Sequence, residues 1–217
     1  MQAEKRKDKG SHLPPSLLLG THNPARIEMV RGILRETAVR VITLAEMGIY
    51  EEVEEDGQST EANAIKKARF YFSRSGIPTL AMDGGLHIDR FAPEKQPGVL
   101  VKRMPGAGGD ILAYYIRELQ AVGGTSPGTW TASQAFAISP DRVLSHTYTF
   151  AVQFTTQRRG ETAPGHALDS IMIDPESGRY YTELSVEERP YYAGTRDFLL
   201  RCLASLPSTA STARGSR

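Results

Sequence analysis

Leu80-Ala81-Met82-Asp83-Gly84-Gly85-Leu86-His87-Ile88-Asp89-Arg90 is the stretch around which the rest of the sequence is organised. The apolar run 79–82 predicts the end of a buried strand, and Asp83 follows it beside two glycines. A carboxylate in such a place reaches a cleft with little obstruction, which suits a metal ligand or a base that activates water. Taken alone, Asp83 fits a turn carboxylate that caps backbone amides better. The other motifs of the chain favour the role as metal ligand or base.

The composition is that of an ordinary globular chain, with 40% hydrophobic and 24% charged residues among 217. The formal net charge of +1 gives no reason to expect a nucleic acid or an acidic membrane as partner, and no apolar run is long enough to span a bilayer. The single cysteine, Cys202, rules out an internal disulfide and fits a reducing, cytoplasmic location. Residues 1–15 and 208–217 predict disordered tails around one α/β domain over 16–207.

The first folded segment predicts a strand, a polar turn and a helix. Residues 16–19 are apolar and strand-like, and Asn23-Pro24 is typical of an N-cap followed by a first helical residue. Free amides at a helix start attract anions, and Arg26 in the first turn is placed to meet a phosphate. An ordinary strand–helix connection explains the same pattern and is more common, so both interpretations stay open.

An acidic run over 51–56 precedes a second predicted helix, which extends from residue 59 or 60 to about residue 75. Such runs are usually solvated, although hard cations also bind clustered carboxylates. Asn63 and Lys67 are four residues apart and therefore share one face of the helix. Lys67 is either an ordinary solvent-facing lysine or a cation that reaches the same cleft as Asp83.

A β-hairpin is the clearest pattern in the second half of the chain. Residues 129–138 predict one strand, and strict alternation from Leu144 to Phe154 predicts its half-buried partner. The remaining elements are a strand over 41–44, a helix from Asp110 to Gly123, a short strand over 171–173, a capping box at 185–188 and a last helix up to Leu206.

In this order the motifs resemble those of the noncanonical purine NTP pyrophosphatases, the family of inosine triphosphate pyrophosphatase, over roughly residues 17–206. Each motif alone is weak, but five of them in the right order make the resemblance specific. The family's Thr-x-Asn-x-x-Lys resembles residues 21–26, its Glu-x-Gly-x-Thr and Asn-Ala-x-x-Lys-Ala resemble 55–59 and 63–68, its Ala-Asp-Asp-Ser-Gly-Leu resembles 81–86, its Pro-Gly-(Val/Ile)-Tyr-Ser-Ala-Arg resembles 97–103, and its Ala-Glu-Leu-(Ser/Thr)-x-Glu-Glu-Lys resembles 182–189.

The resemblance implies an α/β fold with two lobes around a long central mixed β-sheet, flanking helices and a nucleotide cleft between the lobes. It implies a homodimer, Mg²⁺, and attack of water on the α-phosphate of a nucleoside triphosphate, which yields a monophosphate and pyrophosphate. Asp83 and Lys67 would be the catalytic residues, with Asp83 as general base and Glu55 and Asp83 as metal ligands. Phosphate contacts would come from Asn23, Arg26, Lys67, Arg103 and Arg189, and the other substrate-binding positions would be Thr21, Asn63, Gly84, Asp169, Tyr191 and Tyr192.

Several positions depart from the family pattern. Met82 and Gly84 stand where the family has Asp and Ser, residues 166–169 lack the aromatic side chains of Phe-Gly-Tyr-Asp, and residues 191–194 replace the base-binding Ser-His-Arg-Gly. The predicted phosphate-binding residues are therefore closer to the family pattern than the predicted base-binding residues, which predicts altered base specificity. Two alternatives stay open: a catalytically weak nucleotide-binding paralogue that senses or sequesters its ligand, and a general α/β binding module without nucleotide affinity.

Overall fold

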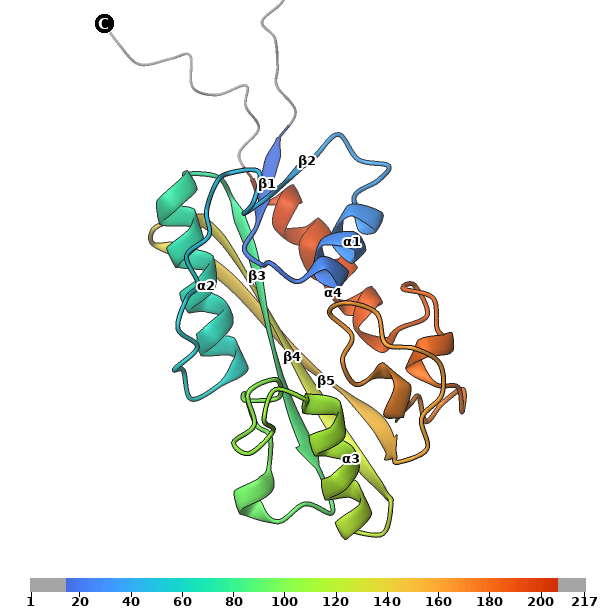
Figure 1. The fold of residues 1–217 in the computed structure, drawn as a ribbon. Coiled ribbons are helices and arrows are strands. Elements are labelled where there is room, and N and C mark those ends of the chain that lie inside the picture. The colour runs from blue at the N-terminus through green and yellow to red at the C-terminus, as the bar shows by residue number, and fades with distance from the viewer. Residues whose placement is uncertain (1–14, 207–217) are drawn as a thin grey trace, which may run out of the picture.

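A computed structural model describes residues 15–206, and its frame is one curled sheet of six strands in the order β2-β1-β3-β4-β5-β6 (Figure 1). β1 pairs in parallel with β2 and β3, and the remaining neighbours are antiparallel, so the predicted mixed sheet is confirmed. The strands are β1 (Ser16–Leu19), β2 (Arg40–Thr43), β3 (Thr79–Ile88), β4 (Thr125–Ser139), β5 (Arg142–Thr155) and β6 (Met172–Ile173).

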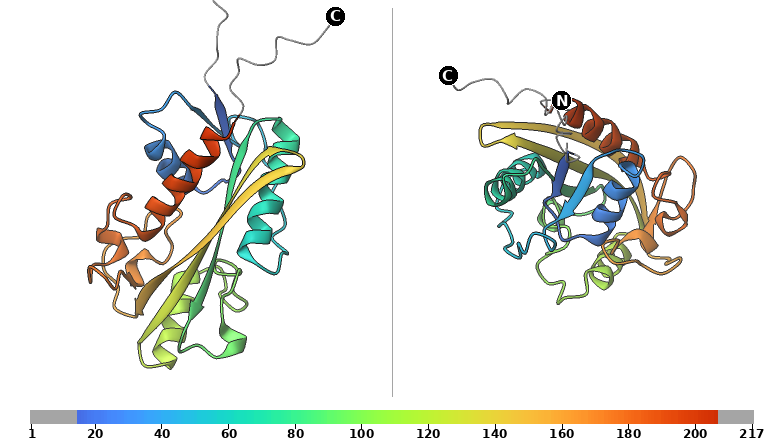
Figure 2. Two further views of the ribbon diagram at one scale, coloured as in Figure 1. Left: turned by 180° about the vertical axis from the view of Figure 1, so that it is seen from behind. Right: turned by 90° about the horizontal axis from the view of Figure 1, so that it is seen from above.

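Helices cover both faces of this sheet. α2 (Thr60–Ser75) lies on one side of the β4–β5 ribbon and α4 (Pro190–Ala204) on the other (Figure 2). α1 (Pro24–Ile33) and α3 (Ile111–Ala121) complete the α-helices. Short 3₁₀ turns span Pro93–Lys95, Asp169–Ile171 and Tyr181–Glu183. Within residues 15–206, no helix is long and apolar enough to cross a membrane.

Two large apolar clusters lie at opposite ends of β3. Leu80 and Met82 pack with α1 and α4 in one cluster, while Leu86 and Ile88 pack with α3 in the other. Because side chains alternate along a strand, these residues share one face of β3, and Ala81 on the opposite face packs against α2. The short segment 83–85 therefore lies between the two clusters.

β3 is longer than predicted, and this changes the position of Asp83. The strand pairs with β4 from Thr79 to Ile88 without a break, and Asp83 lies directly opposite Ser133. The prediction that the strand ends at Asp83 is therefore wrong, and its two glycines continue the strand. Gly85 has a packing reason to lack a side chain, since a Cβ there would lie 2.9 Å from Thr60 Cγ2 and 3.0 Å from the Gly98 carbonyl oxygen.

One edge of β3 is open beside Asp83. β1 pairs with β3 only at Leu18 and Leu19, and the last contact is the Gly20 amide, which donates to the Leu80 carbonyl at 2.8 Å. The next partner along this edge is Gly98, which exchanges two hydrogen bonds with Leu86. Between these points, the part of the chain that the structure describes provides no neighbouring strand for residues 82–84 on this side.

The remaining predictions of local structure agree well with the structure. Asn23 and Ser59 cap α1 and α2 through their side chains, and Gly76 ends α2 with a φ of 67°. β4 starts at Thr125, four residues earlier than predicted. The reciprocal bonds of the capping box at 185–188 form, but they close a turn, and α4 begins only at Pro190. The tails predicted over 1–15 and 208–217 lie outside the described residues, except for residue 15.

We expect Gly85→Ala to lower the free energy of unfolding by about 1–3 kcal/mol, because the new methyl group would press on the Gly98 backbone. Gly32→Ala in α1 is the matched control: a Cβ there meets nothing within 4 Å, so this change should stabilise the protein by about 0.5–1 kcal/mol. Urea unfolding of both variants measures the difference. Equal effects of the two substitutions would contradict the close packing of β3 on Thr60 and Gly98.

Candidate active site

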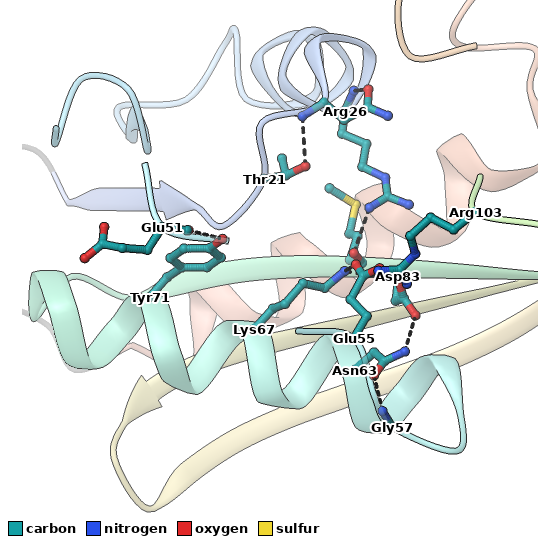
Figure 3. Close-up of polar contacts among 12 residues, drawn as sticks. Thr21, Arg26, Glu51, Glu55, Gly57, Asn63, Lys67, Tyr71, Asp83 and Arg103 are labelled. Atoms are coloured by element: carbon teal, nitrogen blue, oxygen red, sulfur yellow. Dashed lines mark hydrogen bonds and ion pairs between the residues drawn. The ribbon is translucent and has the colours of Figure 1, made fainter. Parts of the chain in front are cut away.

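A buried lysine joins two carboxylates at the centre of the sheet (Figure 3). The Lys67 ammonium lies 3.0 Å from Asp83 Oδ1 and 2.6 Å from Glu55 Oε1. Asn63, one turn earlier on α2, donates from Nδ2 to Asp83 Oδ2 at 3.1 Å. Lys67 and Asp83 are each only 7% exposed. The predicted common face of Asn63 and Lys67 is thus confirmed, and it points at Asp83.

The acidic run supplies Glu55 to this group because its loop is fastened to α2. The Gly57 amide donates to Asn63 Oδ1 at 2.8 Å, and Arg103 Nη2 donates to Glu55 Oε2 at 2.7 Å. Burial alone would raise the pKa of Glu55, but the hydrogen bond and charge of Lys67, with the charges of Arg103 and Arg26, lower it below its ordinary value. Glu55 is therefore an anion at neutral pH.

Arg26 approaches the open edge of β3 from the first turn of α1. Its Nη1 donates to the Met82 carbonyl at 2.7 Å. A Cβ on Gly84 would lie 3.7 Å from Arg26 Nη2 and 3.2 Å from Trp130 Nε1, so a guanidinium and an indole N–H both lie over this glycine. Burial lowers the pKa of Arg26, and the negative charges of Asp83 and Glu55 oppose that effect.

The cleft next to these groups is lined by charged and by aromatic side chains. The charged ones include Asp83, Arg26 and Lys102. Trp130, which lies with Arg26 over Gly84, stacks on Phe150 with ring centroids 6.4 Å apart, and Tyr191 lies 6.0 Å from Phe150. A ligand with an anionic part and a flat, apolar part would match both kinds of side chain.

Arg189 lies beside Asp169 and Tyr191 rather than beside Glu55, Lys67 and Asp83. Its Nη1 donates to Asp169 Oδ2 at 2.6 Å and to the Tyr191 hydroxyl at 3.1 Å, and Nη2 donates to the Tyr181 carbonyl. Arg189 and Asp169 are 8% and 7% exposed. The guanidinium is thus occupied by a buried ion pair, and the phosphate contact predicted for Arg189 does not follow from this geometry.

Some of the other predicted residues line the cleft, and others do not. Asn23 lines the cleft, and Thr21 supports it by accepting from the Asn23 amide at 3.1 Å. Arg103 contacts Glu55. Tyr191 lines the cleft, whereas Tyr192 packs into the apolar cluster of α1 and α4 and is not among the lining residues.

Several lining residues were not predicted from the sequence. Gln134 on β4 donates to the Thr195 hydroxyl at 2.6 Å, and Thr195 lies one helical turn after Tyr191. The alternating pattern of β4 and β5 shows which side chains are half-buried but not that they face a cleft. Lys102 was missed because the family motif that covers it has alanine at this position.

The model of the Ham1 family matches residues 17–192. The chain belongs to the Ham1 family. This Ham1 protein is 31% identical over 176 residues to a dITP/XTP pyrophosphatase of Bacillus subtilis, with 79% of this chain and 87% of the relative covered. It is 28% identical over 177 residues to a dITP/XTP pyrophosphatase of Desulfotalea psychrophila, with 81% and 78% covered. The family predicted from the motifs is therefore confirmed.

A solved structure of a HAM1 protein from Coxiella burnetii shares the fold of this Ham1 protein. Its TM-score is 0.71 at 22% identity, and the match covers 88% of this chain and 98% of that one. The likeness supports the α/β architecture with a mixed sheet that the motifs implied.

The donor set around Lys67 of this Ham1 protein is suitable for a hard divalent cation. Glu55 and Asp83 both contact the same ammonium, so their oxygens lie close together. Mg²⁺ in proteins is commonly bound by one or two carboxylates together with substrate phosphates and water. Within residues 15–206, no group of three His, Cys, Asp or Glu side chains could hold a metal. Substrate and water would therefore have to complete the coordination.

Removing the Asp169 carboxylate should destabilise the protein strongly, because it leaves the Arg189 charge buried without its partner. For Asp169→Ala we expect a loss of about 3–5 kcal/mol in the free energy of unfolding. Asp197→Ala is the control, since Asp197 and Arg196 form an exposed pair at 3.7 Å that is worth at most about 1 kcal/mol. Denaturant unfolding compares them, and a small effect of Asp169→Ala would show that Arg189 finds other partners.

Proposed function

We propose that this Ham1 protein hydrolyses a nucleoside triphosphate to the monophosphate and pyrophosphate. The observation that carries the proposal is the Glu55–Lys67–Asp83 group at the open edge of β3, next to a cleft lined by charged and aromatic side chains. Triphosphate and nucleobase have these same two characters. The dITP/XTP pyrophosphatases of Bacillus subtilis and Desulfotalea psychrophila give the proposal independent support.

In the reaction, a water oxygen forms a bond to the α-phosphorus, and the bond from this phosphorus to the oxygen bridging it to the β-phosphorus breaks. Pyrophosphate leaves with that oxygen. Asp83, whose Oδ1 lies 3.0 Å from the Lys67 ammonium, takes the proton of the attacking water. Lys67 and Arg26 offset the charge on the phosphate oxygens. Glu55 and Asp83 would hold Mg²⁺, whose positive charge would offset negative charge on the substrate.

A nucleotide-binding protein that does not hydrolyse its ligand is the second candidate. Met82 stands where the family has a carboxylate, and every carboxylate oxygen of Glu55 and Asp83 already accepts a hydrogen bond from Lys67, Asn63 or Arg103. Binding without release of pyrophosphate would favour this candidate. The predicted homodimer and cytoplasmic location also belong to the proposal, and sedimentation of the purified protein tests the dimer.

With Mg²⁺ and ITP, the wild-type protein should release pyrophosphate and the monophosphate. Asp83→Asn should lower kcat by about a hundredfold or more, the scale of a lost general base, and should leave nucleotide binding measurable. Asp89→Asn, on an exposed residue near the end of the same strand, is the matched control and should keep full activity. Wild-type turnover in a folded Asp83→Asn variant would contradict the role of Asp83 as general base, and orthophosphate as the product would contradict the proposed reaction.

The aromatic side chains that line the cleft predict weak discrimination between bases. The ring of Tyr191 beside Phe150 and Trp130 can stack on any base, because every base has a π-face. The kcat/KM values for ITP, XTP, GTP and ATP should therefore differ by less than about a hundredfold, or about 2.7 kcal/mol. A larger preference for ITP and XTP would show that another group reads the 6-keto oxygen.

A further inference from the structure

Three polar side chains form a buried network at the first turn of α4, and the proposed reaction makes no use of them. Gln134 on β4 donates from Nε2 to the Thr195 hydroxyl at 2.6 Å and to the Tyr148 hydroxyl at 3.3 Å. Both hydroxyls donate to the Tyr191 carbonyl, at 2.9 Å from Tyr148 and 2.8 Å from Thr195. Gln134 and Thr195 are each only 1% exposed. The network thus ties the start of α4 to β4 and β5.

The direction of each hydrogen bond in this network follows from the protons that are available. A carbonyl oxygen only accepts, and each hydroxyl has a single proton to donate. Both hydroxyls lie closer to the Tyr191 carbonyl than to each other, since the oxygens of Tyr148 and Thr195 are 3.3 Å apart. Their protons are therefore used on the carbonyl, and burial raises the pKa of Tyr148, so its hydroxyl stays protonated. The amide N–H groups of Gln134 are the donors to both hydroxyls, which fixes the orientation of this amide.

This orientation leaves one buried acceptor of the network unpaired. Gln134 Oε1 has no hydrogen-bond partner among the residues that the structure describes. A buried polar atom without a partner lowers the stability of the protein, and an apolar side chain of similar size would avoid that loss. Gly194 also makes room for the network, because a Cβ there would lie 3.2 Å from the Tyr148 ring. A polar network that costs stability and lies in the wall of the cleft is typical of a functional site.

Tyr191 is the residue that this network holds in place. Its carbonyl accepts both hydroxyl protons, and its own hydroxyl accepts from Arg189 Nη1 at 3.1 Å. Its ring lines the cleft, 6.0 Å from the ring of Phe150. The residue is thus fixed at two points, its main chain and its hydroxyl. A ring held in this way loses little conformational freedom when a flat ligand stacks on it.

We propose that Gln134 is a positioning residue for the nucleobase: through Thr195 and Tyr148 it fixes the first turn of α4, and with it the ring on which the base stacks. The proposal rests on the proposed function, because the flat ligand is the base of the substrate nucleotide. Loss of Gln134 should therefore weaken the binding of the base and leave the binding of the phosphates unchanged. Because the ring binds the ground state and the transition state alike, KM should rise with little change in kcat.

Calorimetric titration with two ligands separates base binding from phosphate binding. α,β-Methylene ATP has a base and cannot be cleaved between its α- and β-phosphorus atoms, whereas inorganic tripolyphosphate has the phosphates alone. Gln134→Met should weaken nucleotide binding about fivefold or more, the lower limit for one base–aromatic stack, and change tripolyphosphate binding less than about twofold. Its melting temperature should stay within about 4 °C of that of the wild type. Thr195→Ser keeps the hydroxyl and should bind both ligands as the wild type does.

Thr79→Val is the matched control. The Thr79 hydroxyl is also buried and also donates to a main-chain carbonyl, that of Ile77 at 2.7 Å, but Thr79 does not line the cleft. Its loss should lower the melting temperature by about 2–4 °C, because a buried hydrogen bond is removed. The affinities for both ligands should stay at the wild-type values.

A double-mutant cycle shows whether Gln134 acts through Tyr191. Tyr191→Leu removes the ring but keeps an apolar side chain, and in this background Gln134→Met should no longer weaken nucleotide binding. A full effect of Gln134→Met in the Tyr191→Leu background would overturn the proposal. Equal weakening for both ligands, or an unchanged nucleotide affinity in folded Gln134→Met, would overturn it as well.

The inference and the proposed hydrolysis can fail separately. Absence of nucleotide binding by the wild-type protein would overturn the role of Gln134. A wild type that binds α,β-methylene ATP with the expected dependence on Gln134, but releases no pyrophosphate from ITP or ATP, would keep this inference and refute the enzyme.

Discussion

The structure depends on the ion pair between Lys67 and Asp83. A carboxylate buried in the middle of a six-stranded sheet is costly unless a cation and hydrogen-bond donors satisfy it. α2 supplies both from one face, because Asn63 and Lys67 are four residues apart. The same ammonium then holds Glu55, so one lysine fixes the helix on the sheet and brings the acidic loop to the strand. Such a pair costs stability relative to an apolar core, which is expected where the charges are needed for chemistry.

The second constraint is the short length of β1. Because β1 leaves the sheet at Leu19, β3 continues with a free edge until Gly98 pairs with Leu86. The free edge coincides with the boundary between the two apolar clusters on β3. Because Gly84 and Gly85 have no side chains, neighbouring groups approach the backbone of β3 closely at both residues. β3 is packed at both ends and has an unpaired edge in between. For this reason Asp83 can be buried and still line a cleft.

Local signals in the sequence predicted much of this architecture. The caps of α1 and α2, the hairpin and the common face of Asn63 and Lys67 depend on neighbouring residues, and all of them form. The course of β3 was missed because two glycines in a row are equally typical of a turn, and only their contacts with Thr60, Gly98 and Trp130 explain them as strand residues. The aromatic lining of the cleft, the buried pair of Arg189 with Asp169 and the place of Lys102 depend on segments far apart in the chain, which no local pattern relates.

The most direct test of this account is a crystal structure of the protein with Mg²⁺ and an α,β-methylene nucleoside triphosphate, which cannot be cleaved between its α- and β-phosphorus atoms. We expect the phosphates at the open edge of β3, in contact with Lys67 and Arg26, and the base against Trp130, Phe150 and Tyr191. A nucleotide bound with its phosphates against Arg189, or outside the cleft altogether, would contradict the central role of the Lys67–Asp83 pair.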